Sequence, residues 1–468
     1  MSGTNNLQGG LTRRSFLKTT AAAATGAAAM ATLSGCSSQP AASGPAGEYA
    51  PGQPQNEGEQ IFRGVCRPNC FGFCHLNIHV RDGKVVKTSR APYNEGCYDR
   101  ICQRGLSHVH RIYDPERVAY PMRRAEGTDR GAGEWERLSW DEALTEVADK
   151  ITSIQNQYGQ SAVAFLTQSG NQSGCITSAY SRLINLINAS NISPCLDMGS
   201  FYGMTAMTGY TINSMLGLHM WEGNEPTDAK NAKTIMVWGA NITDAQVQNW
   251  HLIKEAMQGG TKLVVVDPTF TQIAGKSDKW VPIRPGADTA LKYGLMNVIL
   301  EKNGQDEAYL RDHTVAPLLV RSDTGMFLRR SDTGVAPVAT GVINPTTGAE
   351  VMDDPFMVLV DGTLVELRDG VMPAIEGTYD LEGVSCTTAW NILKAEILKF
   401  PPQTVSELTE VPVDDIYALA DICMDGPVYH YEGYGPQAYN NGAHTTMAGL
   451  TLCALTGNLG KPGASYGA

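Results

Sequence analysis

The stretch TIMVWGANITDAQVQNWHLIKEAMQGGTKLVVVDP, residues 234–268, contains two apolar runs that flank a segment of helical length. The runs within 234–242 and 261–268 are nearly continuous rather than alternating, which is typical of parallel strands covered on both faces. The intervening residues 245–257 predict the connecting helix. The stretch therefore predicts a βαβ unit and an α/β fold built on a parallel sheet.

Polar residues and glycines follow these predicted strands. Asp267 lies at the carboxyl end of the second strand, where open α/β sheets bind ligands, and its carboxylate can accept hydrogen bonds from a guanine or a ribose. Gly239 and Asn241 follow the first strand in the same way. The segment IRPGAD then supplies a charged donor, a close backbone approach and a second acceptor: Arg284, Gly286 and Asp288.

Any one of these residues alone is as well explained by a polar turn, but together they favour a nucleotide site. The chain contains no G-x-G-x-x-G, so an ordinary NAD site is not predicted.

A cysteine-rich loop, CRPNCFGFC (residues 66–74), lies well before this unit. Pro68 and Gly72 disfavour a helix, so a loop that wraps back on itself can direct its three thiols to one point. A fourth cysteine follows after 27 residues, which gives the set Cys66, Cys70, Cys74 and Cys102. Four thiolates in this pattern predict a [4Fe–4S] cluster. A zinc site is the competing interpretation, although its thiols usually form two close pairs, and Cys97 competes with Cys102 as fourth ligand.

The N-terminal 36 residues resemble an export signal. TRRSFLK (12–18) matches a twin-arginine signal, and the Ala-rich stretch at 19–33 is too short to span a membrane. LSGC then resembles a lipobox, which predicts lipid attachment at Cys36; the alternative is an ordinary cleavage site with Cys36 idle. Residues 37–60 predict a flexible linker. We therefore expect the protein at the extracytoplasmic face of the cell membrane.

Composition limits the class of protein further. The chain has 468 residues, a net charge of −12 and no Lys/Arg-rich tract beyond its N-terminus, which argues against a nucleic-acid partner. Its length allows two to four domains. Forty-nine glycines with only 7% aromatic residues are typical of α/β proteins that wrap cofactors.

Local patterns predict several further elements. A hairpin is expected to turn at Asp82-Gly83. Ser139 and Glu142 form a capping-box pattern at the start of a helix that should end at Gly159. SAVAFL (161–166) predicts a buried strand, and residues 320–385 predict an irregular, partly β insertion.

The cysteine spacing, CQRG, RIYDPERVAYPMRR and WERLSWDEAL resemble the dimethyl sulfoxide reductase family of molybdopterin oxidoreductases. The resemblance continues through KLVVVDPTFTQIAGKSDKWVPIRPGADTALKYGL, GYGPQAYNNG and LTGNLGKPGASYGA. It covers nearly all of residues 61–468 and is weaker at 310–400. Because relatives continue well beyond this point, the chain resembles the N-terminal half of the family fold, as a fragment or a split gene.

The resemblance implies a multidomain α/β fold and two cofactors. It implies a small iron–sulfur domain (61–122), a discontinuous, truncated α/β molybdopterin domain (123–165 and 390–468), and an α/β dinucleotide-binding domain (166–389) with an irregular insertion near 315–385. The implied cofactors are a [4Fe–4S] cluster and a molybdenum held by two molybdopterin guanine dinucleotides. Arg104 matches the basic residue between cluster and pterin, and Asn441 and Gly442 match a pterin-contacting loop.

The molybdenum ligand is the point at which this chain departs from its family. Sulfoxide reductases place a serine of a Gly-Asp-Tyr-Ser-like segment on the metal, whereas the matching segment here is GSFYG (199–203). The resemblance implies Tyr202 at that position, and a tyrosinate is a hard oxygen donor. Ser200 or Cys195 would take the role if the alignment shifts. The other alternative is that Tyr202 forms a pocket wall and an oxo or hydroxo group completes the metal.

The resemblance implies an anaerobic molybdenum reductase that takes electrons through the cluster. The small substrate would undergo oxygen-atom transfer or reductive dehydroxylation. The implied partners are a membrane quinol-oxidising anchor subunit together with an iron–sulfur electron-transfer subunit. A non-redox hydroxyltransferase or hydratase of the same family is one alternative. A molybdenum-free electron-transfer subunit or fragment is the other.

Overall fold

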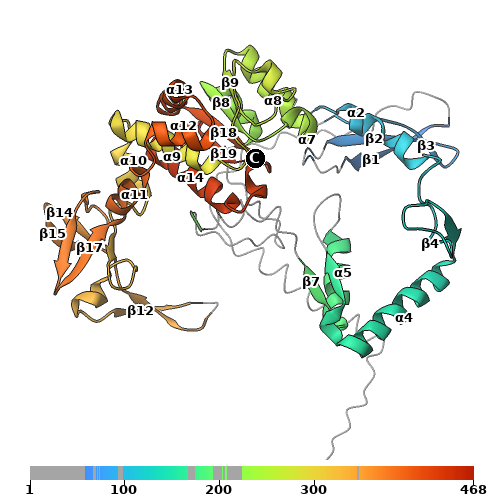
Figure 1. The fold of residues 1–468 in the computed structure, drawn as a ribbon, viewed down its shortest axis with the longest axis horizontal. Coiled ribbons are helices and arrows are strands. Elements are labelled where there is room, and N and C mark those ends of the chain that lie inside the picture. The colour runs from blue at the N-terminus through green and yellow to red at the C-terminus, as the bar shows by residue number, and fades with distance from the viewer. Residues whose placement is uncertain are drawn as a thin grey trace, which may run out of the picture. The chain divides into compact units, whose positions relative to one another are not determined.

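The computed structural model describes residues 58–66, 70, 72, 74–92, 99–166, 174–192, 203, 206–207, 224–344 and 347–467, all within the unit Pro54–Ala468 (Figure 1). The predicted export signal, Cys36 and most of the linker lie outside the described residues. So do Cys97, Cys195, Ser200 and Tyr202.

The first domain is a three-stranded antiparallel sheet with two short helices. Its strands are β1 (Gln60–Val65), β2 (His75–Arg81) and β3 (Lys84–Arg90), and its helices are α2 (Gln103–Leu106) and α3 (His108–Ile112). Asp82 and Gly83 join β2 to β3 with φ of 50° and 74°. Both central residues of the turn thus have positive φ, which matches the turn to the right-handed twist of the two strands. The predicted hairpin is confirmed.

The next segment forms small paired elements around one long helix. It contains the antiparallel pair β4 (Met122–Arg124) and β5 (Trp135–Arg137), then α4 (Trp140–Tyr158), β6 (Ala164–Leu166), α5 (Gly174–Leu186) and β7 (Ser190–Ile192). The predicted capping box is confirmed, since Glu142 N donates to Ser139 Oγ (3.2 Å) and Ser139 N donates to Glu142 Oε2 (2.8 Å). Gly159 ends the helix with φ 96°.

The strand predicted within SAVAFL is present as β6, but its predicted burial is wrong. Among the described strands β6 pairs only with β7, in parallel; Leu166 is 70% exposed and Phe165 is half-buried. β6 is therefore not covered on both faces, although the apolar run suggested that it would be.

A five-stranded parallel sheet forms the centre of the described fold. Its order is β10 (Lys279–Val281), β9 (Lys262–Val266), β8 (Thr234–Trp238), β18 (Val428–Glu432) and β19 (Ser465–Gly467). The helices α7 (Ile242–Ala245) and α8 (Val247–Gln258) connect β8 to β9, so the predicted βαβ unit is confirmed. Numbered along the chain, the order is 3-2-1-4-5, that of a doubly wound dinucleotide-binding sheet.

β18 and β19 extend the sheet that β8 begins. Val428 pairs with Thr234 and Glu432 with Trp238, nearly two hundred residues away in sequence. Strands distant in sequence thus complete one ladder.

Both faces of the sheet are covered (Figure 1). Met236 and Val264 face a large apolar cluster, while their neighbours Ile235 and Val265 face a second cluster that includes Ile253 of α8. The larger cluster is supplied by helices that follow the sheet's first strands: α9 (Asp288–Glu301), α10 (Glu307–His313), α11 (Ala389–Ile397), α12 (Pro402–Thr409), α13 (Val413–Met424) and α14 (Gly442–Leu455). No helix in the described part of the chain is both long and apolar enough to cross a membrane.

Residues 319–388 form the predicted partly β insertion. Its strands are β11 (Leu319–Arg321), β12 (Val338–Ile343), β13 (Glu350–Asp353), β14 (Met357–Val360), β15 (Thr363–Glu366), β16 (Thr378–Leu381) and β17 (Val384–Thr388). They build a three-stranded sheet and two hairpins over a small core that includes Leu319, Leu359 and Cys386.

Candidate functional site

The cysteine loop is closed by its own backbone. Cys66 follows β1, Cys74 precedes β2, and Cys66 N donates to Cys74 O over 2.7 Å. Cys102 is the N-cap residue of α2 and presents its thiol from outside the loop. Cys66, Cys70 and Cys74 are buried, and Cys102 is partly exposed. The structure therefore packs Cys66 and Cys74 into one small core and places Cys70 and Cys102 near enough to affect their electrostatics.

The four thiols influence one another electrostatically. Burial raises the pKa of Cys66 to about 11, with smaller contributions from repulsion by Cys102 and Cys70. The positive charge of Arg111 lowers the pKa of Cys66. Burial and the other three thiols raise the pKa of Cys74 to about 12. Four crowded thiolates are unfavourable without a cation among them, and iron supplies that compensation when it binds.

Two glycines next to the thiols are closely packed against other side chains. A Cβ at Gly72 would lie 3.0 Å from Gln248 Cβ, and one at Gly105 would lie 2.6 Å from Ile101 Cγ1. Among the residues that the structure describes, no three His, Cys, Asp or Glu side chains are grouped to hold a metal ion. The donor set of four thiolates, three of them from one buried loop, fits a [4Fe–4S] cluster.

Arg104 lies on α2, two residues after Cys102, and its side chain is exposed. Its neighbour Arg100 forms an ion pair with Glu255 of α8. Cationic side chains thus occur at Arg100 and Arg104, on both sides of the fourth cysteine in sequence.

The predicted nucleotide residues collect at the carboxyl edge of the five-stranded sheet. Asp267 follows β9 and is only 7% exposed. Its Oδ1 accepts a hydrogen bond from Thr269 N (2.8 Å), and burial raises the pKa of its carboxyl group. A carboxylate held this way keeps acceptor capacity on its second oxygen.

Gly239 directly follows β8, next to the point between β8 and β18 where the strand order reverses. It has φ +51°, and a Cβ there would lie 2.4 Å from Pro436 Cδ. Gly435 N donates to Gly239 O (3.2 Å). Because strand order reverses here, this is the topological switch point at which doubly wound sheets bind ligands.

The side chain of Asn241 forms hydrogen bonds within its own turn. Its Nδ2 donates to Asp244 Oδ2 (2.6 Å), and its Oδ1 accepts from Thr243 Oγ1 (2.8 Å). Its position at the carboxyl edge agrees with the sequence prediction, but its side chain already satisfies a polar turn.

The segment IRPGAD (283–288) packs against the loop that follows β18. Gly286 has φ +80°, and a Cβ there would lie 3.1 Å from the Tyr439 ring. Asn441 Nδ2 donates to Gly286 O (3.1 Å). Arg284 is exposed, whereas Asp288 is 6% exposed at the first turn of α9, where burial raises its pKa to about 6.

Gly442 begins α14 in a position that excludes a side chain. A Cβ there would lie 2.1 Å from Gln437 O. The residues predicted from the ends of β8, β9, β10 and β18 thus lie at one edge of one parallel sheet, around its switch point.

Family models match both parts of this arrangement. The molybdopterin oxidoreductase Fe4S4 domain matches residues 59–114, and molybdopterin oxidoreductase matches residues 117–468. The chain belongs to the molybdopterin oxidoreductase family. The first match contains all four cysteines and the second contains the carboxyl-edge residues, so the family's cofactors are a [4Fe–4S] cluster and molybdenum-molybdopterin.

Curated relatives agree with this family. The chain is 34% identical over 427 residues to a putative dimethyl sulfoxide reductase catalytic chain of Halobacterium salinarum, covering 86% of this chain and 48% of that protein. It is 32% identical over 412 residues to the alpha chain of dimethylsulfide dehydrogenase from Rhodovulum sulfidophilum, covering 84% and 43%. The chain therefore spans about half the length of these relatives.

A solved structure shares the fold. Acetylene hydratase from Pelobacter acetylenicus superposes with a TM-score of 0.55 and 21% sequence identity, over 86% of this chain and 44% of that one. At this identity the similarity supports the fold alone.

A buried charge cluster beneath the carboxyl edge of this molybdopterin oxidoreductase was not predicted from the sequence. Lys292 of α9 is 0% exposed and forms an ion pair with Glu432 at the end of β18. Its Nζ also donates to Thr445 O (3.0 Å) and lies 5.0 Å from the centre of the Trp238 ring. Tyr466 OH donates to the same carboxylate.

A signal for this cluster was present in the sequence. Asp288, Lys292 and Leu295 recur at i, i+4 and i+7 of α9, which places two charged residues on its apolar face. Lys292 then needs a buried anion, which the structure supplies as Glu432 at the end of β18.

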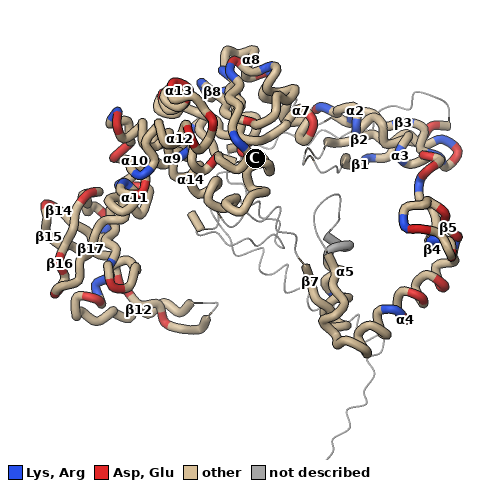
Figure 2. The backbone as a smooth tube through the Cα atoms, viewed as in Figure 1, with Lys and Arg blue, Asp and Glu red and all other residues tan. Residues whose placement is uncertain are grey.

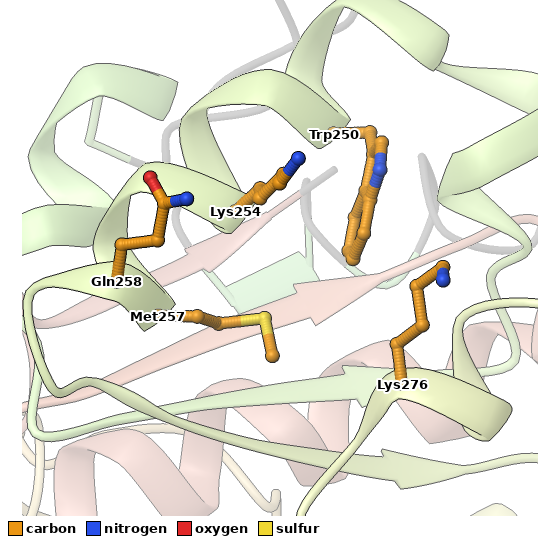
Figure 3. Close-up of a pocket in the computed structure, with 5 residues that line it drawn as sticks. All are labelled: Trp250, Lys254, Met257, Gln258 and Lys276. Atoms are coloured by element: carbon orange, nitrogen blue, oxygen red, sulfur yellow. The ribbon is translucent and has the colours of Figure 1, made fainter.

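A separate open pocket of about 310 Å³ lies against α8 (Figure 3). Figure 3 shows that its side chains come from α8 and from the turn before β10: Trp250, Lys254, Met257, Gln258 and Lys276. Gln258 precedes β9 and Lys276 precedes β10, so this pocket lies toward the amino ends of those strands. It is therefore distinct from the carboxyl-edge site. Acidic and basic residues are interspersed along the described chain (Figure 2).

Proposed function

We propose that this chain is the cluster- and molybdenum-binding part of an anaerobic reductase whose molybdenum is held by two molybdopterin guanine dinucleotides. The observation that carries the proposal is the convergence, in one chain, of four thiols in a cluster domain and of polar residues at a doubly wound switch point. When bound, the cluster carries single electrons and the molybdenum centre supplies oxygen-atom transfer or reductive dehydroxylation of a small substrate.

The carboxyl-edge residues would hold the dinucleotides. Asp267 and Asp288 are buried acceptors suited to guanine N–H or ribose hydroxyl groups. The exposed guanidinium of Arg284 suits a phosphate. Gly239 and Gly286 let Pro436 and Tyr439 pack closely on the backbone at this edge, and they would thereby shape the nucleotide site. Asn441 and Gly442 would shape the loop that borders the pterin.

The groups nearest the reacting atoms are proposed from the resemblance of the GSFYG and CQRG segments to the family. Tyr202 would bind the metal, with Ser200 or Cys195 as the alternatives, and Arg104 would place positive charge between cluster and pterin. In a holoprotein, Y202F should retain iron but lose donor-dependent turnover. Y180F, which changes a half-exposed tyrosine of α5, should retain both.

Partners and location follow from the same proposal. A membrane quinol-oxidising anchor subunit, together with an iron–sulfur subunit, would deliver electrons to the cluster. The two relatives above are each named as one chain of an enzyme, which supports membership of a multisubunit complex. Export by the twin-arginine route with a lipid on Cys36 would hold the protein at the outer face of the membrane.

Electron-donor dependence tests the proposal. Anaerobically purified protein is mixed with reduced viologen and, in turn, a sulfoxide, an oxyanion and a hydroxylated aromatic compound. We expect viologen oxidation with one substrate class, lost in C102S. Turnover of a substrate without any donor would overturn the reductase and support a hydratase, and protein that carries iron but no molybdenum would support an electron-transfer subunit or fragment.

A further inference from the structure

A histidine contacts one of the cluster cysteines. His108 Nε2 lies 3.2 Å from Cys66 Sγ, a short distance for a hydrogen bond to sulfur. His108 is the first residue of α3 and is partly buried. Neither the cysteine pattern nor the family match gives this residue a role.

The scaffold of the cluster domain fixes the histidine in place. Thr88 Oγ1 of β3 donates to the carbonyl oxygens of Gly105 (2.8 Å) and Leu106 (3.0 Å), just before α3. At the other end of α3, Val85 N donates to Tyr113 OH (2.8 Å). The helix that carries His108 is thus attached to β3 at both ends, so the imidazole is positioned without help from a metal.

A donor at this position has a physical consequence for a cluster. When a [4Fe–4S] cluster accepts one electron, the added negative charge spreads onto its sulfurs, and an N–H donor stabilises the reduced form more than the oxidised form. The histidine keeps its proton, so the step consumes one electron from the electron-donating partner and nothing else. Hydrogen bonds to cluster sulfurs are among the factors that set reduction potential.

We propose that His108 donates an Nε2–H···S hydrogen bond to the Cys66 thiolate and raises the reduction potential of the cluster. It acts as a positioning residue for the electron-transfer step. The inference rests on the cluster assignment and is independent of which substrate the protein reduces.

Three substitutions separate the hydrogen bond from the side chain's bulk and polarity. H108L removes the donor, H108N keeps a polar amide that is too short to reach Cys66, and H108Q places an amide N–H near the original Nε2. H110L is the matched control, because His110 lies on the same helix and is exposed.

The readout is an anaerobic potentiometric titration of the holoprotein, followed by the paramagnetic signal of the reduced cluster. At the wild-type midpoint, we expect the ratio of reduced to oxidised cluster to fall about tenfold in H108L and H108N, a shift of about 59 mV for one electron. H108Q and H110L should titrate like the wild type.

The outcomes distinguish this inference from the cluster assignment. Iron-replete H108L and H108N with unchanged midpoints would overturn the role of His108 alone. If H108L loses iron, the midpoint potentials of H108N and H108Q are compared instead. Equal midpoints in these two variants would overturn the role of His108. Wild-type protein that takes up no iron would overturn the cluster assignment and this inference with it.

Discussion

The cluster domain and the five-stranded sheet hold their sites in opposite ways. In the described part of the cluster domain the buried apolar group consists of Cys66, Cys74 and Leu76, so two of the proposed cluster ligands form most of the core. The sheet is buried between two large apolar clusters that contain none of the predicted nucleotide residues. One region depends on its cofactor for its core, whereas the other forms a core first and presents its site at an edge.

This difference has a thermodynamic meaning. Where ligands are the core, the free energy of metal binding is also folding free energy. Where apolar strands form the core, polar residues at strand ends change binding more than stability. Four substitutions or treatments, taken from the largest expected effect to the smallest, test the comparison.

Iron removal should separate the two regions most clearly. We expect C70A, or iron-free protein, to lose amide-exchange protection throughout 59–114 while β8, β9 and β18 keep theirs, because the sheet does not depend on the cluster. C386A truncates an equally buried thiol outside the cluster domain and should leave 59–114 protected. Equal loss of protection in the sheet would contradict the comparison.

Replacing Lys292 of the buried ion pair tests how strongly the core beside the sheet is desolvated. K292M leaves Glu432 buried without its cation, which should cost about 3–5 kcal/mol of the free energy of unfolding. The measurement is urea unfolding followed by tryptophan fluorescence. K292M/E432Q, which removes both charges, should recover part of that loss, and a K292M cost below about 1 kcal/mol would show that the pair is not desolvated as described.

Asp288 should make the sheet's stability depend on pH. Burial raises its folded pKa to about 6 from an ordinary value of 3.8, so the folded state binds more protons than the unfolded state between these values. Stability from this group therefore falls as pH rises through that window and stays reduced above it. D288N should be more stable than wild type by roughly 2–3 kcal/mol at pH 7.5 and similar to it near pH 4.

Chemical unfolding of the iron-loaded protein at several pH values measures this difference. A D288N advantage that is the same at pH 4 and pH 7.5 would rule out ionisation of Asp288 as its cause. The same variant should bind the nucleotide cofactor more weakly if Asp288 is an acceptor.

The smallest effect is expected in α4, which has neither a metal ligand nor a buried residue. S139A removes the capping hydrogen bond and should cost about 1 kcal/mol. Amide exchange should rise in the first turns of α4 only, and S153A, an exposed mid-helix change, should not raise it. A change that spreads into the cluster domain or the sheet would mean that α4 is coupled to them.

Local signals in the sequence predicted the features that depend on neighbouring residues. The hairpin at Asp82-Gly83, the capping box at Ser139 and the βαβ unit can each be predicted from one continuous stretch of sequence. Each of the three is confirmed. The cysteine set was predictable because thiols at such spacing have few other uses. The carboxyl-edge residues were predictable because parallel strands end at the same edge.

Features that depend on distant pairing were not predicted. β18 joins β8 across nearly two hundred residues, Lys292 meets Glu432 across 140, and His108 meets Cys66 across 42. A buried lysine and an exposed one look alike until the partner strand is known. Tyr202 and Ser200 lie outside the described residues, so their roles stay predictions.

Iron and molybdenum per chain, measured by elemental analysis after anaerobic purification from a cofactor-producing host, test the central claim most directly. We expect about four iron atoms and about one molybdenum per chain, with the iron lost when Cys70 or Cys102 is replaced by serine. Zinc in place of iron, or iron that persists without those cysteines, would contradict the cluster site. Four iron atoms without molybdenum would contradict the proposal that this chain itself holds both centres.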